Sequence, residues 1–518
     1  MELAKQNAFG IRLVLTSLLL GIAGDLILGS EAWGLSLPVF AAFLIGQVLL
    51  VSRVSERKLS RISIGLLAGA LLFSLCFMWR EAPELKLLNG LAVFSLVGLA
   101  ALHATGKRLG TAPIPEFAVK ALAYWAVFVA DFLLLVFKDV KWAEAVKQKG
   151  LAGTSAVGRG LLIAVPLLLI FGGLLVSADA SFQKFMEQFV NFDAGTVATH
   201  VFIGAACAVL TGGLLRHLFL SSEAPPVSAP PPLPFVLAPN YHQPYRSPEP
   251  FRLGTIEFGI VLGSLNLLFG LFVLVEAPYL FGGAQHVLST AHLSFADYAR
   301  RGFFELVAVV GLAIPVLLGS HALIKPESPS AERLWRSMAV IMASLLFVVM
   351  QSAVQRMRLY VDLYSLTTQR IYVLAALGWM ALMLLWFLAT TVRGRSDRFA
   401  FGGFASLLGM ILLVNAINPD ALIVRYNVAQ AKPGKPIDGA YLRGLSSDAT
   451  PDLIRFESKL DQPTRTELAS TWLAEEKASH NQWRSWTISR REANDAIDAN
   501  RPQILADSRA VVAAEIHP

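Results

Sequence analysis

The chain has 518 residues, of which 55% are hydrophobic and only 16% are charged. Soluble proteins carry about 25% charged residues, so this composition excludes an ordinary soluble globular protein and predicts a chain that is largely dissolved in a lipid bilayer. The formal net charge is +7, but the last 100 residues carry 13 Lys and Arg against 14 Asp and Glu. The positive excess therefore lies in the first 418 residues, where basic cytoplasmic loops explain it without nucleic acid as a partner.

Apolar runs of about 20 residues, each long enough to cross a bilayer, follow one another along the chain. The first run follows Met1–Ala8 and has no cleavage-site pattern after it, so we interpret it as a retained helix rather than a signal peptide. The sequence predicts an all-α, polytopic transmembrane helix bundle of 11 spans, at 9–29, 33–52, 62–79, 86–104, 156–177, 198–220, 255–278, 302–323, 335–355, 370–391 and 400–417.

One more apolar stretch, Phe117–Phe137, has basic residues on both sides. A full crossing would place one of these basic groups outside, against the positive-inside rule, so we predict an interfacial or re-entrant helix there. Twelve spans are the alternative. With 11 spans and basic loops inside, the N-terminus is cytoplasmic and the C-terminus is extracytoplasmic, in the inner membrane of a bacterium.

Four regions follow from these patterns. Residues 1–222 form a first membrane region that includes the 117–137 helix, and residues 255–418 form a second membrane region. Between them, residues 223–254 are rich in proline, favour extended conformations and are predicted to be a cytoplasmic linker. Residues 419–518 are predicted to form a small soluble tail.

The tail has the sequence signals of short helices. Thr450 as an N-cap followed by Pro451 predicts one helix start, and Pro463 with Thr464 predicts a second. A third helix is predicted in SRREANDAIDANRP and should end before Pro502. We therefore expect a helical appendage rather than a catalytic α/β domain.

Catalytic motifs and metal-ligand spacings were not found in the sequence. It contains no phosphate-binding loop, no GxGxxG after a strand, no HExxH and no GxSxG. The two cysteines, Cys76 and Cys207, lie in apolar runs without CxxC spacing, and the histidines are scattered. We expect no cofactor and no metal, and the sequence favours a protein that is not an enzyme.

Several segments near the C-terminal side are distinctive: RLYVDLYSLTTQRIY from Arg358, NPDALIVRYNV from Asn418, DGAYLRGLSSDATPDL from Asp438 and WRSWTISRREA from Trp483. Over roughly Arg356–Ala493 they resemble a bacterial family of multi-pass membrane proteins catalogued as domain of unknown function four-one-seven-three, with a close sibling, four-one-five-three. The resemblance implies a bacterial membrane protein and carries no reaction, ligand or catalytic residue.

Three functions remain open on the sequence. The first is a non-catalytic protein that senses, scaffolds or assists envelope processes through its outer face. The second is a transporter of a small anionic solute or lipid, and the third is a membrane-embedded transferase. The polar residues within spans, Asp25, His200, Asn266 and Asn415, are expected to form hydrogen bonds between helices.

The segment from Arg358 to Tyr372 supplies candidate binding residues. Charged residues are costly in lipid and call for partners, yet a set of them converges at one membrane depth. Arginine's planar fork suits a carboxylate or phosphate, so these residues would form an outer-leaflet polar vestibule for an anionic lipid or small anionic ligand. The candidates are Arg358, Asp362, Tyr364, Arg370, Glu276, Arg300, Arg301 and Glu305.

Two local features refine that prediction. Arg358 and Asp362 are four residues apart and would pair if the helix continues past Gln355, and Ser365 or Thr367 would cap the next helix. The bilayer is the main expected partner. Gly259 and Gly263 form a GxxxG pattern, which favours close packing within the bundle or a homo-oligomer.

Overall fold

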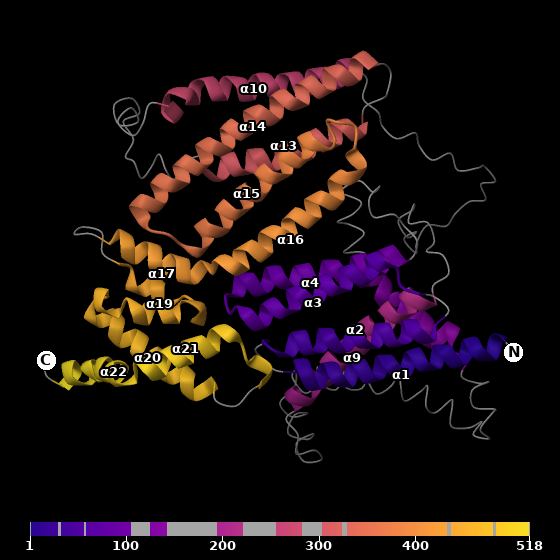
Figure 1. Cartoon of the computed structure of the whole chain (residues 1–518), viewed down its shortest axis with the longest axis horizontal. Coiled ribbons are helices and arrows are strands. Elements are labelled where there is room, and N and C mark those ends of the chain that lie inside the picture. The colour runs from indigo at the N-terminus through magenta and orange to yellow at the C-terminus, as the bar shows by residue number, and fades with distance from the viewer. Residues whose placement is uncertain are drawn as a thin grey trace, which may run out of the picture.

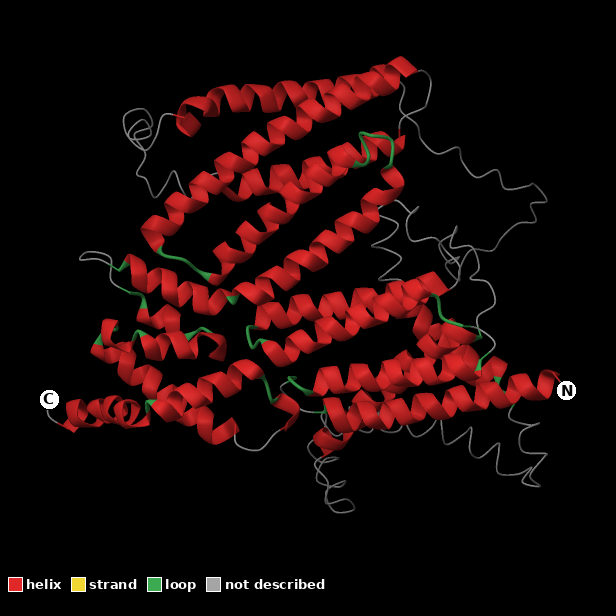
Figure 2. Cartoon of the chain, viewed as in Figure 1, coloured by secondary structure: helices red, strands yellow, loops and turns green. Residues whose placement is uncertain are grey.

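A computed structural model of the chain describes residues 2–29, 33–55, 58–104, 125–141, 194–220, 255–281, 303–323, 329–431, 437–479 and 483–516. The described part consists of helices joined by loops and contains no β-strand (Figure 2). Long helices run roughly side by side, and shorter C-terminal helices gather at one end of them (Figure 1). The prediction of an all-α, polytopic membrane bundle with a helical tail is confirmed.

The long helices form two groups. The first contains α1 (Glu2–Leu28), α2 (Ser36–Val54), α3 (Arg61–Trp79), α4 (Pro83–Ala104) and α9 (Ala194–Phe219). The second contains α10 (Thr255–Phe281), α13 (Phe303–Leu323), α14 (Pro329–Tyr364), α15 (Thr368–Ala389), the short η2 (Ser396–Arg398) and α16 (Phe399–Ile417). Figure 1 shows the second group lying above the first.

Nine helices within the described residues are long and apolar enough to cross a membrane, so the protein is a multi-pass membrane protein. A tenth, α13, has a shorter apolar part at Leu306–His321. The predicted span at 156–177 and the proline-rich segment 223–254 lie outside the described residues. The totals of 11 and 12 spans therefore stay predictions.

The described part of the 117–137 stretch is helical. Residues 125–134 form an α-helix that continues as a π-helix, η1 (Leu135–Asp139). It ends beside the N-terminal part of α1, where the Asn7 side chain accepts a hydrogen bond from Lys141 N (2.7 Å) and donates one to Lys141 O (3.2 Å). Residues 105–124 lie outside the described part, so the interfacial or re-entrant interpretation stays a prediction.

The tail is built from α17 (Pro419–Gln430), α18 (Gly439–Arg443), η3 (Ser447–Ala449), α19 (Thr450–Arg455), η4 (Glu457–Lys459), α20 (Gln462–Ser479), η5 (Trp483–Ser485), α21 (Ile488–Ala499) and α22 (Arg501–Ile516). The three predicted tail helices correspond to α19, α20 and α21, and α21 ends before Pro502 as expected.

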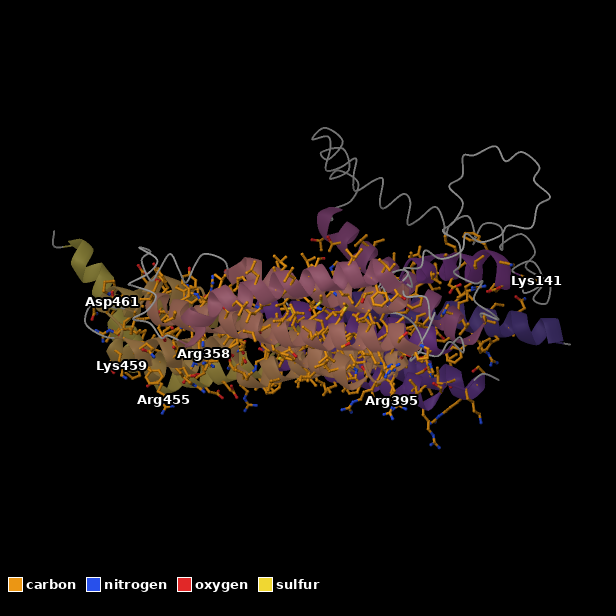
Figure 3. The ribbon with its side chains drawn as sticks, turned by 90° about the horizontal axis from the view of Figure 1, so that it is seen from above. Lys141, Arg358, Arg395, Arg455, Lys459 and Asp461 are labelled. Atoms are coloured by element: carbon orange, nitrogen blue, oxygen red, sulfur yellow. The ribbon has the colours of Figure 1, made fainter. Side chains whose placement is uncertain are left out.

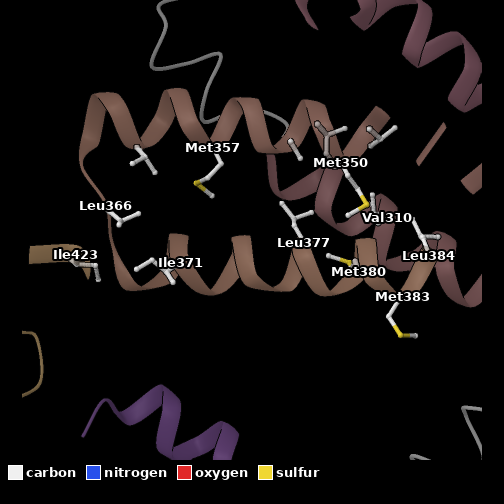
Figure 4. Close-up of a cluster of buried hydrophobic side chains, with 14 of the residues drawn as sticks. Val310, Met350, Met357, Leu366, Ile371, Leu377, Met380, Met383, Leu384 and Ile423 are labelled. Carbon is white, nitrogen blue, oxygen red and sulfur yellow. The ribbon is translucent and has the colours of Figure 1, made fainter. Parts of the chain in front are cut away.

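Within the described residues, two large hydrophobic cores and a small cluster of Ala82, Leu85 and Val414 hold these elements. One core belongs to the first group of helices and reaches Ile411 on α16. The other runs from α10 through α14 and α15 into the tail (Figure 4), where Leu366 and Ile371 of the bundle belong to the same cluster as Ile423 of α17. The tail and the second group of helices therefore bury apolar surface together, which stabilises the tail on the bundle.

Glycines permit a close contact between helices α1 and α9. A Cβ atom on Gly24 would lie 2.6 Å from Cys207 Sγ, and one on Gly21 would lie 2.7 Å from Gly204 O. Small residues at such crossings are typical of membrane helices. The predicted GxxxG pair behaves differently: among the described residues, a Cβ on Gly259 would meet nothing within 4 Å. The homo-oligomer stays a prediction.

The start of α1 and the tail lie at opposite ends of the bundle (Figure 1). Figure 3 shows Lys141 toward the end where α1 begins, and Arg358, Lys459 and Asp461 toward the tail end. The connections at 33–35, 80–82 and 365–367 also meet the tail. Polar groups from distant parts of the sequence are thereby brought together at this end.

Candidate functional site

The turn between α14 and α15 contains the residues that the sequence singled out. Helix α14 continues to Tyr364, as the predicted pairing of Arg358 with Asp362 requires. Arg370 donates from Nη1 to Tyr364 O (2.9 Å) and to Ser365 O, and its guanidinium lies 4.2 Å above the Tyr360 ring. Arg370 therefore holds the turn in shape, which includes Ser365 in the left-handed region at φ 65°.

The structure describes the side chains of only some of the other predicted binding residues. Arg358 is exposed, and the exposed Asp362 accepts a hydrogen bond from Tyr426 Oη (3.1 Å). Glu276 lies on α10 and Glu305 on α13, but their side chains are outside the described part, as are the residues Arg300 and Arg301. The vestibule formed by all eight residues stays a prediction.

The tail caps α15. Thr367 is the N-cap residue, which is one of the two predicted positions, but its side chain makes no capping hydrogen bond. Tyr441 Oη of α18 accepts from Thr368 N (2.7 Å) instead. Asn427 of α17 accepts from Leu366 N (2.7 Å) and donates to Leu366 O (2.9 Å). Three backbone groups of the turn are thus satisfied by tail side chains.

Asp448 of η3 lies at the centre of a second contact between bundle and tail, which we name the Asp448 junction. Its Oδ2 atom accepts from Glu81 N (2.9 Å), Ala82 N (2.8 Å) and Ser446 Oγ (3.1 Å). Its Oδ1 atom accepts from Ser489 Oγ of α21. The two backbone amides immediately precede α4, and a helix N-terminus favours an anion because its N–H groups and dipole point at the ligand.

Arg80 joins the junction to the membrane helices. It donates from Nε to Asn415 O at the end of α16 (2.8 Å), and its Nη1 lies 3.8 Å from Asp448 Oδ1. Burial lowers the pKa of Arg80, and the Asp448 carboxylate opposes that shift. Asn415 also exchanges two side-chain hydrogen bonds with Asn89 of α4 (3.0 and 2.9 Å).

Glu81 extends the junction along α21. Its carboxylate accepts from Thr487 Oγ1 (2.7 Å) and from Arg490 Nη2 (3.2 Å) of the tail, and from Lys86 Nζ of α4 (2.9 Å). The α3–α4 loop therefore binds the tail in two ways. Its backbone amides bind Asp448, and the Glu81 side chain binds Thr487 and Arg490.

Asp420 of α17 is a further buried acid at this end. Ser446 donates to Asp420 Oδ2 from its backbone N (3.0 Å) and from its hydroxyl (2.6 Å). Burial raises the pKa of Asp420, the two hydrogen bonds from Ser446 lower it, and the charges of Asp448 and Glu84 raise it further. Ser446 thereby links the two aspartates, since its single hydroxyl hydrogen is shared between Asp420 Oδ2 (2.6 Å) and Asp448 Oδ2 (3.1 Å).

The sequence segments that carry the family resemblance supply most of these contacts. The segment from Asn418 contributes Asp420 and Asn427, the segment from Asp438 contributes Tyr441, Ser446 and Asp448, and the segment from Trp483 contributes Thr487, Ser489 and Arg490. The Asp448 junction was not predicted, although the sequence segments that form much of it were singled out by the family resemblance.

A second buried polar cluster, the Asp131 network, lies near the other end of the bundle. Arg216 of α9 donates from Nη1 to Asp131 Oδ1 and from Nε to Asp139 Oδ2 (2.6 Å). His217 Nδ1 lies 2.7 Å from Asp131 Oδ2. An α-helix turns by about 100° per residue, and the wider π-helix turns by roughly 80°. The π-turn of η1 therefore brings Asp139 to the side of the helix that carries Asp131.

The polar residues within spans form hydrogen bonds, as expected. Asp25 Oδ1 of α1 lies 2.7 Å from His200 Nδ1 of α9, Asn266 donates to Met338 O (3.0 Å), and Asn415 pairs with Asn89. Searched over the described residues, the chain contains no group of three or more metal-ligating side chains. A cavity of about 280 Å³ beside α9 is lined by apolar residues such as Val129 and Phe202.

One family profile matches the chain. It is described as "Domain of unknown function (DUF4153)" and covers residues 67–456, which is more than half of the sequence. It extends from α3 to the end of α19 and so contains Arg80, Glu81, Asp420 and Asp448. No curated protein and no solved structure matches the chain.

Proposed function

Because the chain belongs to the DUF4153 family, which carries no assigned reaction, we propose that it is a non-catalytic membrane scaffold that holds its helical tail in a fixed position at one face of the membrane. In this role the bundle fixes the protein in the membrane, and the tail presents the surface that senses or assists envelope processes. Kinship with the four-one-seven-three family and a bacterial source belong to the same proposal.

The Asp448 junction is the observation that supports this proposal. Asp448 is 5% exposed, and its carboxylate accepts from the α3–α4 loop, from Ser446 beside it and from Ser489 of α21. Buried polar networks with satisfied members hold one geometry, because breaking any contact leaves a buried group without a partner. Such a junction suits a tail whose orientation matters more than its mobility.

Replacing Asp448 with alanine tests the scaffold directly. The variant should insert into the membrane at the normal level, while its tail becomes sensitive to protease and the variant no longer complements a deletion strain. Asp495→Ala, on the exposed face of α21, is the matched control and should behave as the parent. Full complementation by a variant with a released tail would show that a fixed tail is not the function.

We place the tail outside the cytoplasm of a bacterium and the start of α1 inside. Arg53 near the end of α2, Arg61 at the start of α3 and Arg395 before α16 lie on connections at the end of the bundle opposite the tail, as the positive-inside rule favours. Alkaline phosphatase fused after Pro518 should be active, and a fluorescent protein that folds only in the cytoplasm should be dark there. The reverse pattern would support the 12-span alternative.

An anionic lipid or small anionic ligand at the predicted vestibule belongs to this proposal as its ligand. Arg370 holds the turn through two carbonyl oxygens, so its replacement would disturb the fold. Arg358 is exposed and is the informative position. Arg358→Lys should preserve protein level and lose complementation, because lysine lacks the bidentate fork. Unchanged complementation would remove Arg358 from the site.

A transporter is the second candidate function, and the Asp131 network is the observation that favours it. Ionisable residues within spans often mark ion or proton pathways. Proteoliposomes loaded with a pH-sensitive dye should acidify when a mixture of small organic anions is added outside, and Asp131→Asn should abolish the response. A parent protein that gives no response in this assay leaves the scaffold as the function.

A further inference from the structure

A short tail segment, from Trp483 to Trp486, is fixed to the start of a membrane helix. Gly34 N donates to Arg484 O (3.1 Å), and Leu35 N donates to Trp486 O (2.9 Å). A Cβ atom on Gly34 would lie 2.5 Å from Trp486 O, so only glycine permits this approach. Leu35 immediately precedes α2, which begins at Ser36 and is long and apolar enough to span. The segment therefore lies at the level where α2 enters the membrane.

Exposed indole rings gather at this level. Trp483 is 51% exposed, Trp486 is 37% exposed and Trp33, beside Gly34, is 47% exposed. Trp33 also donates from its ring nitrogen to Leu28 O (3.2 Å), the last residue of α1. Indole combines an apolar body with one N–H donor, so it prefers the boundary between hydrocarbon and water over either phase. The third tail tryptophan, Trp472, is buried and has no such position.

Basic groups accompany these rings. The Arg484 guanidinium lies 5.9 Å from the Trp483 ring centre, and the Arg80 guanidinium lies 4.6 Å from the ring centre of Trp79, the last residue of α3. Arg80 is engaged with Asn415 and Asp448, which leaves Arg484 as the cation of the exposed segment. A guanidinium at headgroup depth can bind lipid phosphate oxygens.

We propose that Trp33, Trp483, Arg484 and Trp486 form an interfacial anchor, which seats the Trp483–Trp486 segment of the tail in the phospholipid headgroup layer beside α2. The tail is then held at two places, by the Asp448 junction on the bundle and by lipid at this segment. This inference does not depend on the scaffold proposal, because it concerns the depth of one segment and not the use of the tail.

An exposed charged pair on α21 provides the contrast. Arg491 Nε lies 3.8 Å from Asp495 Oδ2, and both side chains are exposed, as expected of a surface in water. A spin label at 483 or 486 should therefore report lipid, and one at 495 should report water.

The test uses the full chain with Cys76 and Cys207 replaced by alanine and a single cysteine introduced at 483, 486 or 495. The proteins are reconstituted in nanodiscs of phosphatidylcholine and phosphatidylglycerol, where no other protein can cover the segment. Labels at 483 and 486 should collide more with oxygen and less with a water-soluble nickel complex than the label at 495. Equal collision with the nickel complex at all three positions would overturn the anchor.

A second measurement keeps both native cysteines in place and adds no spin label. Brominated phospholipids quench the fluorescence of tryptophans that touch lipid. The double variant Trp483→Phe and Trp486→Phe should lose part of the quenched signal, whereas Trp472→Phe should lose only signal that lipid does not quench. If the two variants leave the same quenched fraction, the rings do not contact lipid and the proposal is wrong.

Discussion

Asp448 and Asp131 are equally buried, each 5% exposed, yet the protein surrounds them with different partners. Asp448 accepts mainly from uncharged donors, two backbone amides and two serine hydroxyls. Asp131 accepts from the side chains of Arg216 and His217. The Asp448 carboxylate is therefore stabilised mainly by amide and hydroxyl dipoles, and the Asp131 carboxylate is stabilised by basic side chains.

The difference follows from what each location can offer. Past the first turn of a helix, backbone N–H groups are already bonded to carbonyls four residues earlier, so only side chains can reach a carboxylate. The α3–α4 loop precedes a helix start, where backbone N–H groups have no such partner. A buried acid near the loop can therefore use the backbone, and a buried acid within the helices needs a basic residue.

The same substitution at both positions should separate the two arrangements, with the larger effect at Asp131. Asp131→Asn removes the charge opposite Arg216, and breaking a buried ion pair costs about 3–5 kcal/mol. The melting temperature of the detergent-solubilised protein should fall strongly. Arg336→Met, which breaks the exposed pair with Glu332, is the control and should change stability by less than about 1 kcal/mol.

Asp448→Asn should be milder. The amide oxygen can still accept from Glu81 N and Ala82 N, and the amide nitrogen can donate to the Ser489 hydroxyl, so the main loss is the charge opposite Arg80. We expect about 1–3 kcal/mol, measured by the same melting experiment and by protease sensitivity of the tail. If Asp448→Asn lowers the melting temperature as much as Asp131→Asn does, stabilisation of a buried acid by dipoles does not differ in energy from stabilisation by basic side chains.

Glu457 of η4 extends the comparison, because its surroundings favour the protonated, neutral form of its carboxyl group. The pKa of Glu457 is raised from 4.5 to about 7; burial is the largest cause, a hydrogen bond to Asp507 and the charge of Asp507 act in the same direction, and the charge of Arg465 opposes them. The folded tail then binds more protons than the unfolded chain between these two values. The free energy of unfolding should therefore fall as pH rises from about 4.5 to about 7 and level off above it.

Glu457→Gln should remove that slope and make the protein more stable than the parent above about pH 7. Melting temperatures recorded from about pH 5 to about pH 8 check both points. Glu467→Gln, at an exposed position on α20 that pairs with Arg443, should leave the slope of the parent. A slope that survives in Glu457→Gln would assign the effect to another group.

Local patterns in the sequence predicted the spans well, because a crossing helix needs only length and apolar residues. The end of α21 before Pro502 was also predicted, whereas the continuation of α14 to Tyr364 was only the condition for a pair between Arg358 and Asp362. Helix α22 was missed because Pro502 was interpreted only as a stop, whereas proline also suits the first turn of a new helix. Helix α17, from Pro419, was missed although it begins with the same signal.

The junction could not be predicted from local patterns. Asp448 binds amides that lie 366 and 367 positions away, and Asn89 pairs with Asn415 across 326 positions. No spacing rule connects residues so far apart. In the turn between α14 and α15, Arg370 binds a backbone carbonyl only six positions away, but Asn427 and Tyr441, which also bind this turn, come from the tail.

The smallest expected effect concerns that loop. Tyr441 Oη accepts from Thr368 N (2.7 Å) and lies 2.9 Å from Thr368 Oγ1, so Tyr441→Phe leaves the first turn of α15 without its cap. Loss of a helix cap costs about 0.5–2 kcal/mol, and hydrogen exchange at the start of α15 should rise accordingly. Tyr426→Phe, which removes the hydrogen bond to the exposed Asp362, should change little, since water can replace the phenol there. If both variants exchange like the parent, Tyr441 does not stabilise the turn, and the contribution of the tail at this loop comes from the side-chain amide of Asn427.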